Sequence, residues 1–141
     1  MDNEDVFHIG VKVLIINQEG YLLLLCSVPN DGKEMFWDIP GGRIQRGETI
    51  FDTLNRELYE ETGLRLQGKE VKFVQAKLSN TRITVRKDND VGLLFLIYRC
   101  VWNEAPLISM SSEHSCFQWV DPKEAIQNSK QAFWASLAVW S

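Results

Sequence analysis

Apolar stretches rich in β-branched residues alternate along the chain with short polar breaks, a pattern that predicts a sheet of several strands. Residues 7–16 (FHIGVKVLII) have the composition of a first strand, and residues 21–27 (YLLLLCS) that of a second. Because the turn signal at 17–20 (NQEG) lies between them, we expect the two strands to form a hairpin. Further strand signals lie in residues 36–39, 70–85, 91–102 and 116–120.

The segment 49–62 has the pattern of an amphipathic helix. Thr49 is suited to the N-cap, and Asp52 follows three residues later, as in a capping box with Asp in place of Glu. Gly63 is a natural end for the helix, because glycine adopts the left-handed conformation that follows many helices. The expected apolar stripe consists of Phe51, Leu54 and Leu58.

The remaining signals set the fold class. Residues 40–42 (PGG) predict a break in regular structure. Residues 121–122 (DP) predict the start of a helix that continues to about residue 127, and a second short helix is expected over 130–140. The length suggests one domain over residues 1–141. The expected class is α/β or α+β, with helices packed on a mixed sheet.

Composition and charge limit the function classes. The chain has 45% hydrophobic and 24% charged residues, as in an ordinary globular protein, and a net charge of -4. This charge argues against a protein that binds a nucleic-acid polymer, because such proteins usually present a basic face. No apolar run approaches the length of a membrane span, and the first residues (MDNEDVF) lack a signal-peptide core. We therefore expect a cytoplasmic protein without a membrane partner.

Three cysteines, Cys26, Cys100 and Cys116, are spread along the chain without close pairs. The odd count, and the apolar strand-like surroundings of two of them, favour buried thiols in a reducing cytosol. A zinc site is not expected, because it would need paired ligands at short spacing.

Three glutamates, Glu57, Glu60 and Glu61, stand at spacings of three and four residues within the expected helix. These spacings place the carboxylates on one side of a helix, where like charges cost free energy unless a cation lies among them. An oxygen-only cluster suits a hard divalent ion, so we expect Mg²⁺, with Mn²⁺ as an alternative. The competing interpretation is a solvated acidic face on a surface helix.

The segment 42–64 (GRIQRGETIFDTLNRELYEETGL) resembles the Nudix box, whose pattern is G-x5-E-x7-R-E-U-x-E-E-x-G-U with U an aliphatic residue. Every specified position is filled. The matching residues are Gly42, Glu48, Arg56, Glu57, Leu58, Glu60, Glu61, Gly63 and Leu64. The resemblance implies the Nudix fold, a mixed sheet sandwiched between helices, and MutT-like hydrolysis of nucleoside diphosphates linked to another group X.

The resemblance also implies roles within the box. Glu57, Glu60 and Glu61 would be the metal ligands and catalytic residues, and the backbone carbonyl of Gly42 would complete the metal site. This agrees with the residue types, because glycines at 41–42 let the backbone approach an ion closely.

The Glu48 and Arg56 positions are implied to support the site through an internal ion pair that holds a loop to the helix. The residue types fit this role, since a guanidinium fork is suited to binding a carboxylate with two hydrogen bonds.

Four residues outside these roles are further candidates. Glu113 precedes a Trp-containing strand and resembles the distal-loop carboxylate that some family members use as a metal ligand or base; the alternative is a solvated loop residue. Trp37 could stack on a base, and Arg43 and Arg82 could reach phosphates of a substrate. Core packing for the tryptophan and solvation for the arginines are the competing interpretations.

The implied activity is metal-dependent hydrolysis of a pyrophosphate bond in a small nucleotide-derived substrate, with nucleoside triphosphates as one candidate. The residues at 79–82 (SNTR) lack the markers of ADP-ribose and dinucleoside polyphosphate hydrolases. One alternative is a non-catalytic module on the same fold that binds a nucleotide or sugar nucleotide. Isoprenoid diphosphate isomerisation would need a catalytic cysteine near the pocket, and RNA cap removal would need an RNA-binding face. Many relatives are dimers, so a homodimer is also considered.

Overall fold

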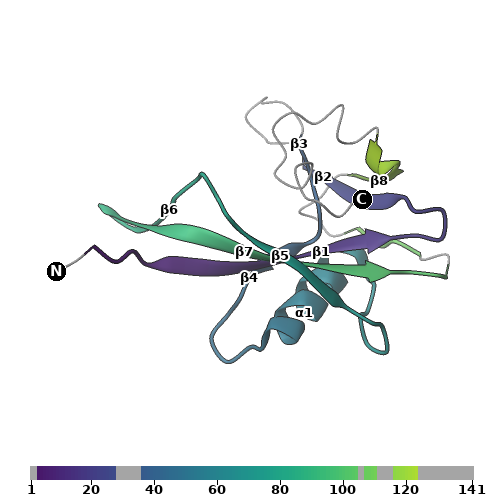
Figure 1. Cartoon of the computed structure of the whole chain (residues 1–141), viewed down its shortest axis with the longest axis horizontal. Helices are drawn as coiled ribbons and strands as arrows, with labels where there is room; N and C mark the ends of the chain where they lie inside the picture. Colours follow the sequence, from purple (N-terminus) through teal and green to yellow (C-terminus); the bar gives the residue numbers. More distant parts are fainter. Residues whose placement is uncertain (1–2, 28–35, 105–106, 111–115, 124–141) are drawn as a thin grey trace.

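The computed structural model describes residues 3–27, 36–104, 107–110 and 116–123. Within these ranges the chain forms an eight-stranded sheet, on which helix α1 packs (Figure 1). Helix α1 spans Ile50–Thr62. The strands are β1 (Phe7–Ile16), β2 (Leu22–Ser27), β3 (Phe36–Asp38), β4 (Gly41–Arg43), β5 (Lys72–Leu78), β6 (Ile83–Arg86), β7 (Asn89–Val101) and β8 (Cys116–Val120).

Strand β1 lies in the middle of the sheet, between β2 and β7. It pairs antiparallel with β2 where Ile16 faces Leu22, so the hairpin expected from the sequence is confirmed. On its other side β1 runs parallel to β7, from Phe7 opposite Gly92 to Ile16 opposite Val101. Strands β3 and β8 also pair with β2, and β5 and β6 pair with β7. The sheet contains both strand orientations, as predicted for a mixed sheet.

Helix α1 begins and ends where the sequence predicts. The Thr49 hydroxyl accepts a hydrogen bond from the Asp52 N–H, and the Asp52 carboxylate accepts one from the Thr49 N–H. This reciprocal pair is the expected capping box, with Asp in the usual place of Glu. Gly63 adopts a left-handed conformation with φ of 78°, and its N–H donates to the Tyr59 carbonyl at the end of the helix.

The apolar stripe of α1 differs in one position from the prediction. Leu54 and Leu58 are buried, but Phe51 is 44% exposed. The buried face runs from Leu54 through Leu58 to Thr62 in steps of four residues, which turns Phe51 to the flank of the helix.

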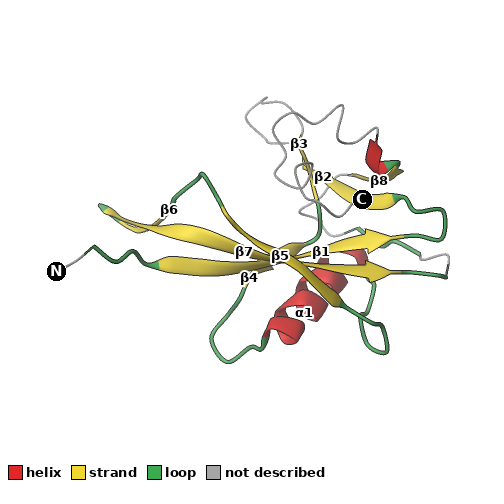
Figure 2. Ribbon diagram, in the orientation of Figure 1, coloured by secondary structure: helices red, strands yellow, loops and turns green. Residues whose placement is uncertain are grey.

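Side chains of β1 alternate between the two faces of the sheet, and each face has its own core. Val11, Val13 and Ile15 pack with Leu54 and Leu58 of α1, which lies on one side of the sheet (Figure 2). The opposite face carries a second buried cluster. Its members are Leu14, Leu22, Leu24, Ile39 and Ile97.

The expected C-terminal helices lie mostly outside the described residues. Pro122 and Lys123 are helical, in agreement with a helix start at Asp121, and the predicted helix over 130–140 lies beyond the described part. None of the helices in the described part of the chain is long and apolar enough to cross a membrane.

The break predicted at residues 40–42 is present but shorter than expected: β3 ends at Asp38, and Ile39 and Pro40 form the turn that follows it. Gly41 and Gly42 open strand β4, which pairs antiparallel with β1. Glycine makes this close approach sterically allowed, because a Cβ on Gly41 would overlap the Val11 carbonyl and the Lys12 side chain. The pairing places Gly41 and Gly42 against the central strand of the sheet.

The prediction of buried thiols is wrong for two of the three cysteines. Cys26 and Cys116 form a disulfide with their Cα atoms 5.2 Å apart. They meet because β2 and β8 pair antiparallel with these two residues opposite each other. Cys100 is the free cysteine within the described ranges, and it is buried as expected. Because 90 positions separate the two cysteines in the sequence, their spacing did not indicate that they would meet.

Candidate active site

The turn between β3 and β4 is anchored on both sides. The Pro40 carbonyl accepts a 3.0 Å hydrogen bond from the N–H of Val13 on β1. The Gly41 N–H donates a 2.9 Å hydrogen bond to Glu61 Oε1 on α1. The turn is thereby held between the central strand and the helix that carries the acidic residues.

Glu57 lies directly over Gly42. A Cβ at this glycine would overlap the Glu57 carboxylate, so only glycine lets the carboxylate approach the backbone of β4 this closely. The same carboxylate accepts a 2.9 Å hydrogen bond from Arg56 Nη1. Two of the residues implied by the box as metal ligands are therefore in contact.

The expected ion pair between Glu48 and Arg56 is present. Arg56 Nε donates to Glu48 Oε2 at 2.6 Å, and Arg56 Nη2 donates to Glu48 Oε1 at 3.0 Å. The Thr53 hydroxyl and the Gln45 N–H also donate to Glu48 Oε1. The hydrogen bonds from Arg56 are the largest cause that lowers the pKa of Glu48 from 4.5 to about 2. The loop before α1 is thus fastened to the helix by a charged residue on each side.

Arg56 also engages the next acidic residue along the helix. The Glu60 side chain is 56% exposed, and its Oε2 lies 3.5 Å from Arg56 Nη1. One guanidinium therefore contacts Glu48, Glu57 and Glu60, and it partly offsets their mutual repulsion.

Glu61 differs from its neighbour because it is only 7% exposed. Burial raises the pKa of Glu61 to about 8. The nearby carboxylates of Glu57 and Asp38 act in the same direction. The hydrogen bond from Gly41 and the charge of Lys12 oppose the shift. The end of the turn thus donates a hydrogen bond to a carboxyl group that is shielded from water.

The donor atoms at this turn fit a hard divalent cation. They are carboxylate oxygens and a glycine carbonyl, the ligand type that Mg²⁺ prefers. Within the described ranges, no three His, Cys, Asp or Glu side chains form a preassembled cation site. Arg56 holds two of the carboxylates, so Glu57 and Glu60 would turn from it toward an ion. A cation would also favour the charged form of the buried Glu61.

Lys12 is a residue at this site that the sequence analysis missed. It is 9% exposed, and its Nζ donates to Asp38 Oδ2 at 2.9 Å and to the Ile39 carbonyl at 3.3 Å. Its stem packs against Gly41, and its Nζ lies 5.7 Å from the centre of the Phe95 ring. A single lysine inside the apolar run 7–16 is the signal that could have indicated a buried, paired charge.

Two of the predicted substrate contacts lie on strands beside the turn. Trp37, on β3, is half-buried and packs on the core cluster opposite α1. The Arg43 carbonyl accepts a 3.4 Å hydrogen bond from Arg56 Nη2, and the Arg43 guanidinium lies 3.4 Å from His8 Nδ1. A role for either in substrate binding stays a prediction.

The other two candidates are Arg82 and Glu113, and the structure describes only the first of them. Arg82 donates two hydrogen bonds to Asp5, at 2.8 and 2.9 Å, and one of 2.7 Å to Asp90. A phosphate at Arg82 would have to displace these carboxylates. Glu113 lies outside the described residues, so its expected part in the site remains a prediction.

The sequence of this chain is similar to those of known proteins. The family model described as the NUDIX domain matches residues 6–138. Nucleoside triphosphatase NudI of Escherichia coli (strain K12) is 30% identical over 119 residues, which cover 80% of this chain and 81% of that protein. The MutT-like protein of Streptomyces ambofaciens is 25% identical over 125 residues, which cover 89% of this chain and 71% of that protein.

Solved structures show the same fold. The MutT protein from Methanosarcina mazei Go1 superposes with a TM-score of 0.70 at 23% identity, covering 89% of this chain and 85% of that chain. The E. coli dihydroneopterin triphosphate pyrophosphohydrolase superposes with a TM-score of 0.67 at 19% identity, covering 86% and 87% of the two chains. The overall fold of this chain is therefore shared with these proteins.

Proposed function

The chain belongs to the NUDIX domain family and is a Nudix hydrolase, and on this basis we propose that it hydrolyses a pyrophosphate bond of nucleoside triphosphates with Mg²⁺. Members of the family act on nucleoside diphosphate derivatives. The single observation that carries the proposal is the position of helix α1, with its three glutamates, against Gly41 and Gly42. Glu57 lies over Gly42 and Glu61 accepts a hydrogen bond from Gly41, so two carboxylates meet the backbone at one place.

The residues of the chain have distinct tasks in this proposal. Glu57, Glu60, Glu61 and the Gly42 carbonyl would hold the divalent ion. When bound, Mg²⁺ or Mn²⁺ would offset charge on the phosphate oxygens and lower the pKa of an attacking water. A carboxylate accepts the proton from that water, either one of the box glutamates or Glu113.

Two further contacts keep these groups in place. The ion pair between Glu48 and Arg56 fastens the loop to the helix. Lys12 holds Asp38 and the Ile39 carbonyl, and thereby the start of the turn. Such fixed geometry supports catalysis because the reacting groups need no reorganisation when the substrate binds.

The choice of a triphosphate substrate has support from two relatives. One 30% identical relative is described as a nucleoside triphosphatase, and a protein with the same fold is described as a pyrophosphohydrolase of a pterin triphosphate. The expected products are a nucleoside monophosphate and pyrophosphate.

A substrate panel tests the proposal. Nucleoside triphosphates and nucleoside diphosphate derivatives are incubated with the protein in Mg²⁺ or Mn²⁺, and released phosphate products are quantified. The best substrate should be cleaved only with a divalent ion, and Glu61→Gln and Glu60→Gln should each lower kcat at least about 100-fold. Glu19→Gln, at an exposed glutamate in the β1–β2 turn, is the matched control and should retain full activity.

Two results would contradict the proposal. Full turnover by both box variants would show that these carboxylates do not carry the reaction. Saturable binding of a nucleotide without any release of phosphate would instead support the alternative of a binding module on the same fold.

A further inference from the structure

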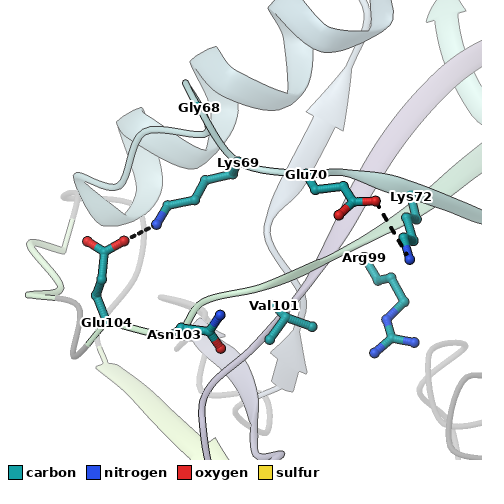
Figure 3. Close-up of a pocket in the computed structure, with 8 residues that line it drawn as sticks. All are labelled: Gly68, Lys69, Glu70, Lys72, Arg99, Val101, Asn103 and Glu104. Atoms are coloured by element: carbon teal, nitrogen blue, oxygen red, sulfur yellow. Dashed lines mark hydrogen bonds and ion pairs between the residues drawn. The ribbon is translucent and has the colours of Figure 1, made fainter.

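A hollow of about 400 Å³ lies where β5 and β7 pair, beside the loop that follows α1 (Figure 3). Its wall includes the side chains of Lys69, Lys72 and Arg99 together with Asn103 and Glu104. None of the residues that line it belongs to the box segment 42–64. Its volume falls in the range of small-molecule sites, so the chemistry of its wall decides what it could bind.

The first of the three cations is already neutralised. Lys69 forms an ion pair with Glu104 across the rim of the hollow, as the dashed line in Figure 3 shows. Its Nζ also lies 4.4 Å from the centre of the Trp102 ring. Lys69 therefore closes one end of the hollow rather than offering a free charge.

Arg99 has no such partner. It is half-buried on β7, and no hydrogen bond or ion pair joins its guanidinium to any residue in the described part of the chain. Lys72 stands opposite Arg99 in the antiparallel register of β5 and β7, so both side chains leave the sheet on the same face. Lys72 is 68% exposed and lies 3.7 Å from Glu70, a distance that leaves it weakly paired.

The side chains that line the hollow therefore carry one more positive than negative charge. The ion pair of Lys69 with Glu104 cancels, and so does that of Lys72 with Glu70, which leaves the charge of Arg99. A half-buried guanidinium beside a second cation is stabilised when an anion accepts its hydrogen bonds. Asn103, four residues after Arg99 along the same segment, also lines the hollow and offers a neutral amide donor (Figure 3).

We propose that this hollow binds a phosphate group, with Arg99 as the bidentate donor and Lys72 and Asn103 as supporting donors. The planar fork of Arg99 matches two oxygens of a tetrahedral phosphate, and the flexible ammonium of Lys72 reaches a third. The phosphate is either free or attached to a small molecule that fits the hollow. The proposal does not depend on the hydrolysis proposed above, because it uses no residue of the box.

NMR of the isotope-labelled full chain tests this site directly. Inorganic phosphate, and separately a nucleoside monophosphate, are titrated at constant ionic strength in EDTA, while the Arg99 Nε–H and the Asn103 side-chain amide signals are followed. Saturable shifts at both positions are expected. Tighter binding of the nucleoside monophosphate than of phosphate would show that the ligand is a phosphorylated small molecule, and equal binding would assign the site to the phosphate group alone.

Variants assign the shifts to the hollow. Arg99→Ala and Arg99→Lys should each weaken binding at least about 10-fold, because a lysine cannot make the two parallel hydrogen bonds of the fork. Arg99→Lys keeps the charge and the stem, so it decides the matter if Arg99→Ala fails to fold. Lys87→Ala removes one exposed cation from the β6–β7 turn and should leave the affinity unchanged. Shifts that do not saturate, or equal affinity in Arg99→Lys and the wild type, would overturn the proposal.

Discussion

The Lys12 ammonium donates a 2.9 Å hydrogen bond to the Asp38 carboxylate, although 26 positions separate the two residues in the chain. The pair joins the central strand β1 to the last residue of β3, just before the turn that leads to Gly41 and Gly42. The same ammonium also donates to the Ile39 carbonyl, and its charge acts on Glu61. A lysine on the sheet thus supports the geometry of an acidic helix.

Replacing Lys12 by methionine should therefore disturb both stability and activity. Lys12→Met keeps the packing of the stem but removes the ammonium that donates to Asp38 Oδ2 and to the Ile39 carbonyl, which should cost about 2 kcal/mol in the free energy of unfolding. Urea denaturation measures this change, and kcat should fall in parallel. Lys87→Met at an exposed turn is the control and should stay within about 0.5 kcal/mol. Equal loss in the two variants would show that the buried pair contributes nothing specific.

Arg56 should be the residue of the box on which stability depends most. Arg56→Ala removes a guanidinium that contacts Glu48, Glu57 and Glu60 at once, so its charge no longer offsets the repulsion among the three carboxylates. We expect a loss of about 2 kcal/mol or more in the free energy of unfolding, measured by urea denaturation. Arg46→Ala, at an exposed position in the same loop, should change stability by less than about 0.5 kcal/mol. A similar effect of both variants would show that the contacts of Arg56 with the three carboxylates do not stabilise the fold.

The Glu48 carboxyl should make stability depend on pH in the acid range. Its pKa is lowered from 4.5 to about 2 in the folded protein, chiefly by Arg56. The stabilisation is therefore fully present above the unfolded pKa, and is lost as pH falls through the folded pKa. In urea titrations between pH 5 and pH 2, Glu48→Gln should show a flatter decline than the wild type. Parallel curves for the two proteins would mean that Glu48 titrates alike in both states.

Gly42 should be intolerant of any side chain. In Gly42→Ala the new Cβ would overlap the Glu57 carboxylate, which must then move away from β4. We expect kcat to fall at least about 10-fold, because displaced groups lose their productive geometry. Gly20→Ala is the matched glycine variant: its Cβ meets open space, but its φ of 82° costs stability. Phosphate-release assays on both variants should separate loss of activity from loss of stability. Full activity of Gly42→Ala would show that the close approach of Glu57 to Gly42 is not needed for the reaction.

The cysteines can be counted chemically. Thiol titration of the unfolded, unreduced protein should find one reactive group, from Cys100, and reduction should expose two more from Cys26 and Cys116. Because the bond closes a separation of 90 residues, its reduction should lower the free energy of unfolding by on the order of 3 kcal/mol. Three thiols before reduction would show that the purified protein does not contain the disulfide.

Local patterns were the part of the fold that the sequence could predict. The capping residues Thr49 and Gly63 lie within a few positions of the helix ends that they define, so spacing alone located α1. The ion pair of Glu48 with Arg56 followed from the resemblance of the box. Phe51 escaped the prediction because its exposure depends on how the helix is rotated against the sheet.

Long-range contacts could not be predicted in the same way. The parallel pairing of β1 with β7 and the meeting of Cys26 with Cys116 depend on the order of strands in the sheet. The hydrogen bonds of Arg82 to Asp5 cross 77 positions of the chain. Periodicity reports which face of an element is apolar, but it holds no information on which element lies beside it.

Glu60 and Glu61 show what the sequence determines and what only the tertiary structure determines. Their spacing from Glu57 was enough to place all three acidic groups on one side of a helix, since the geometry of the α-helix is the same in every protein. Only the tertiary structure decided that Glu60 faces water while Glu61 is buried against Gly41. The reason is that successive residues point about 100° apart around a helix axis. The packing of α1 against β4 therefore determines that Glu61, and not Glu60, is buried.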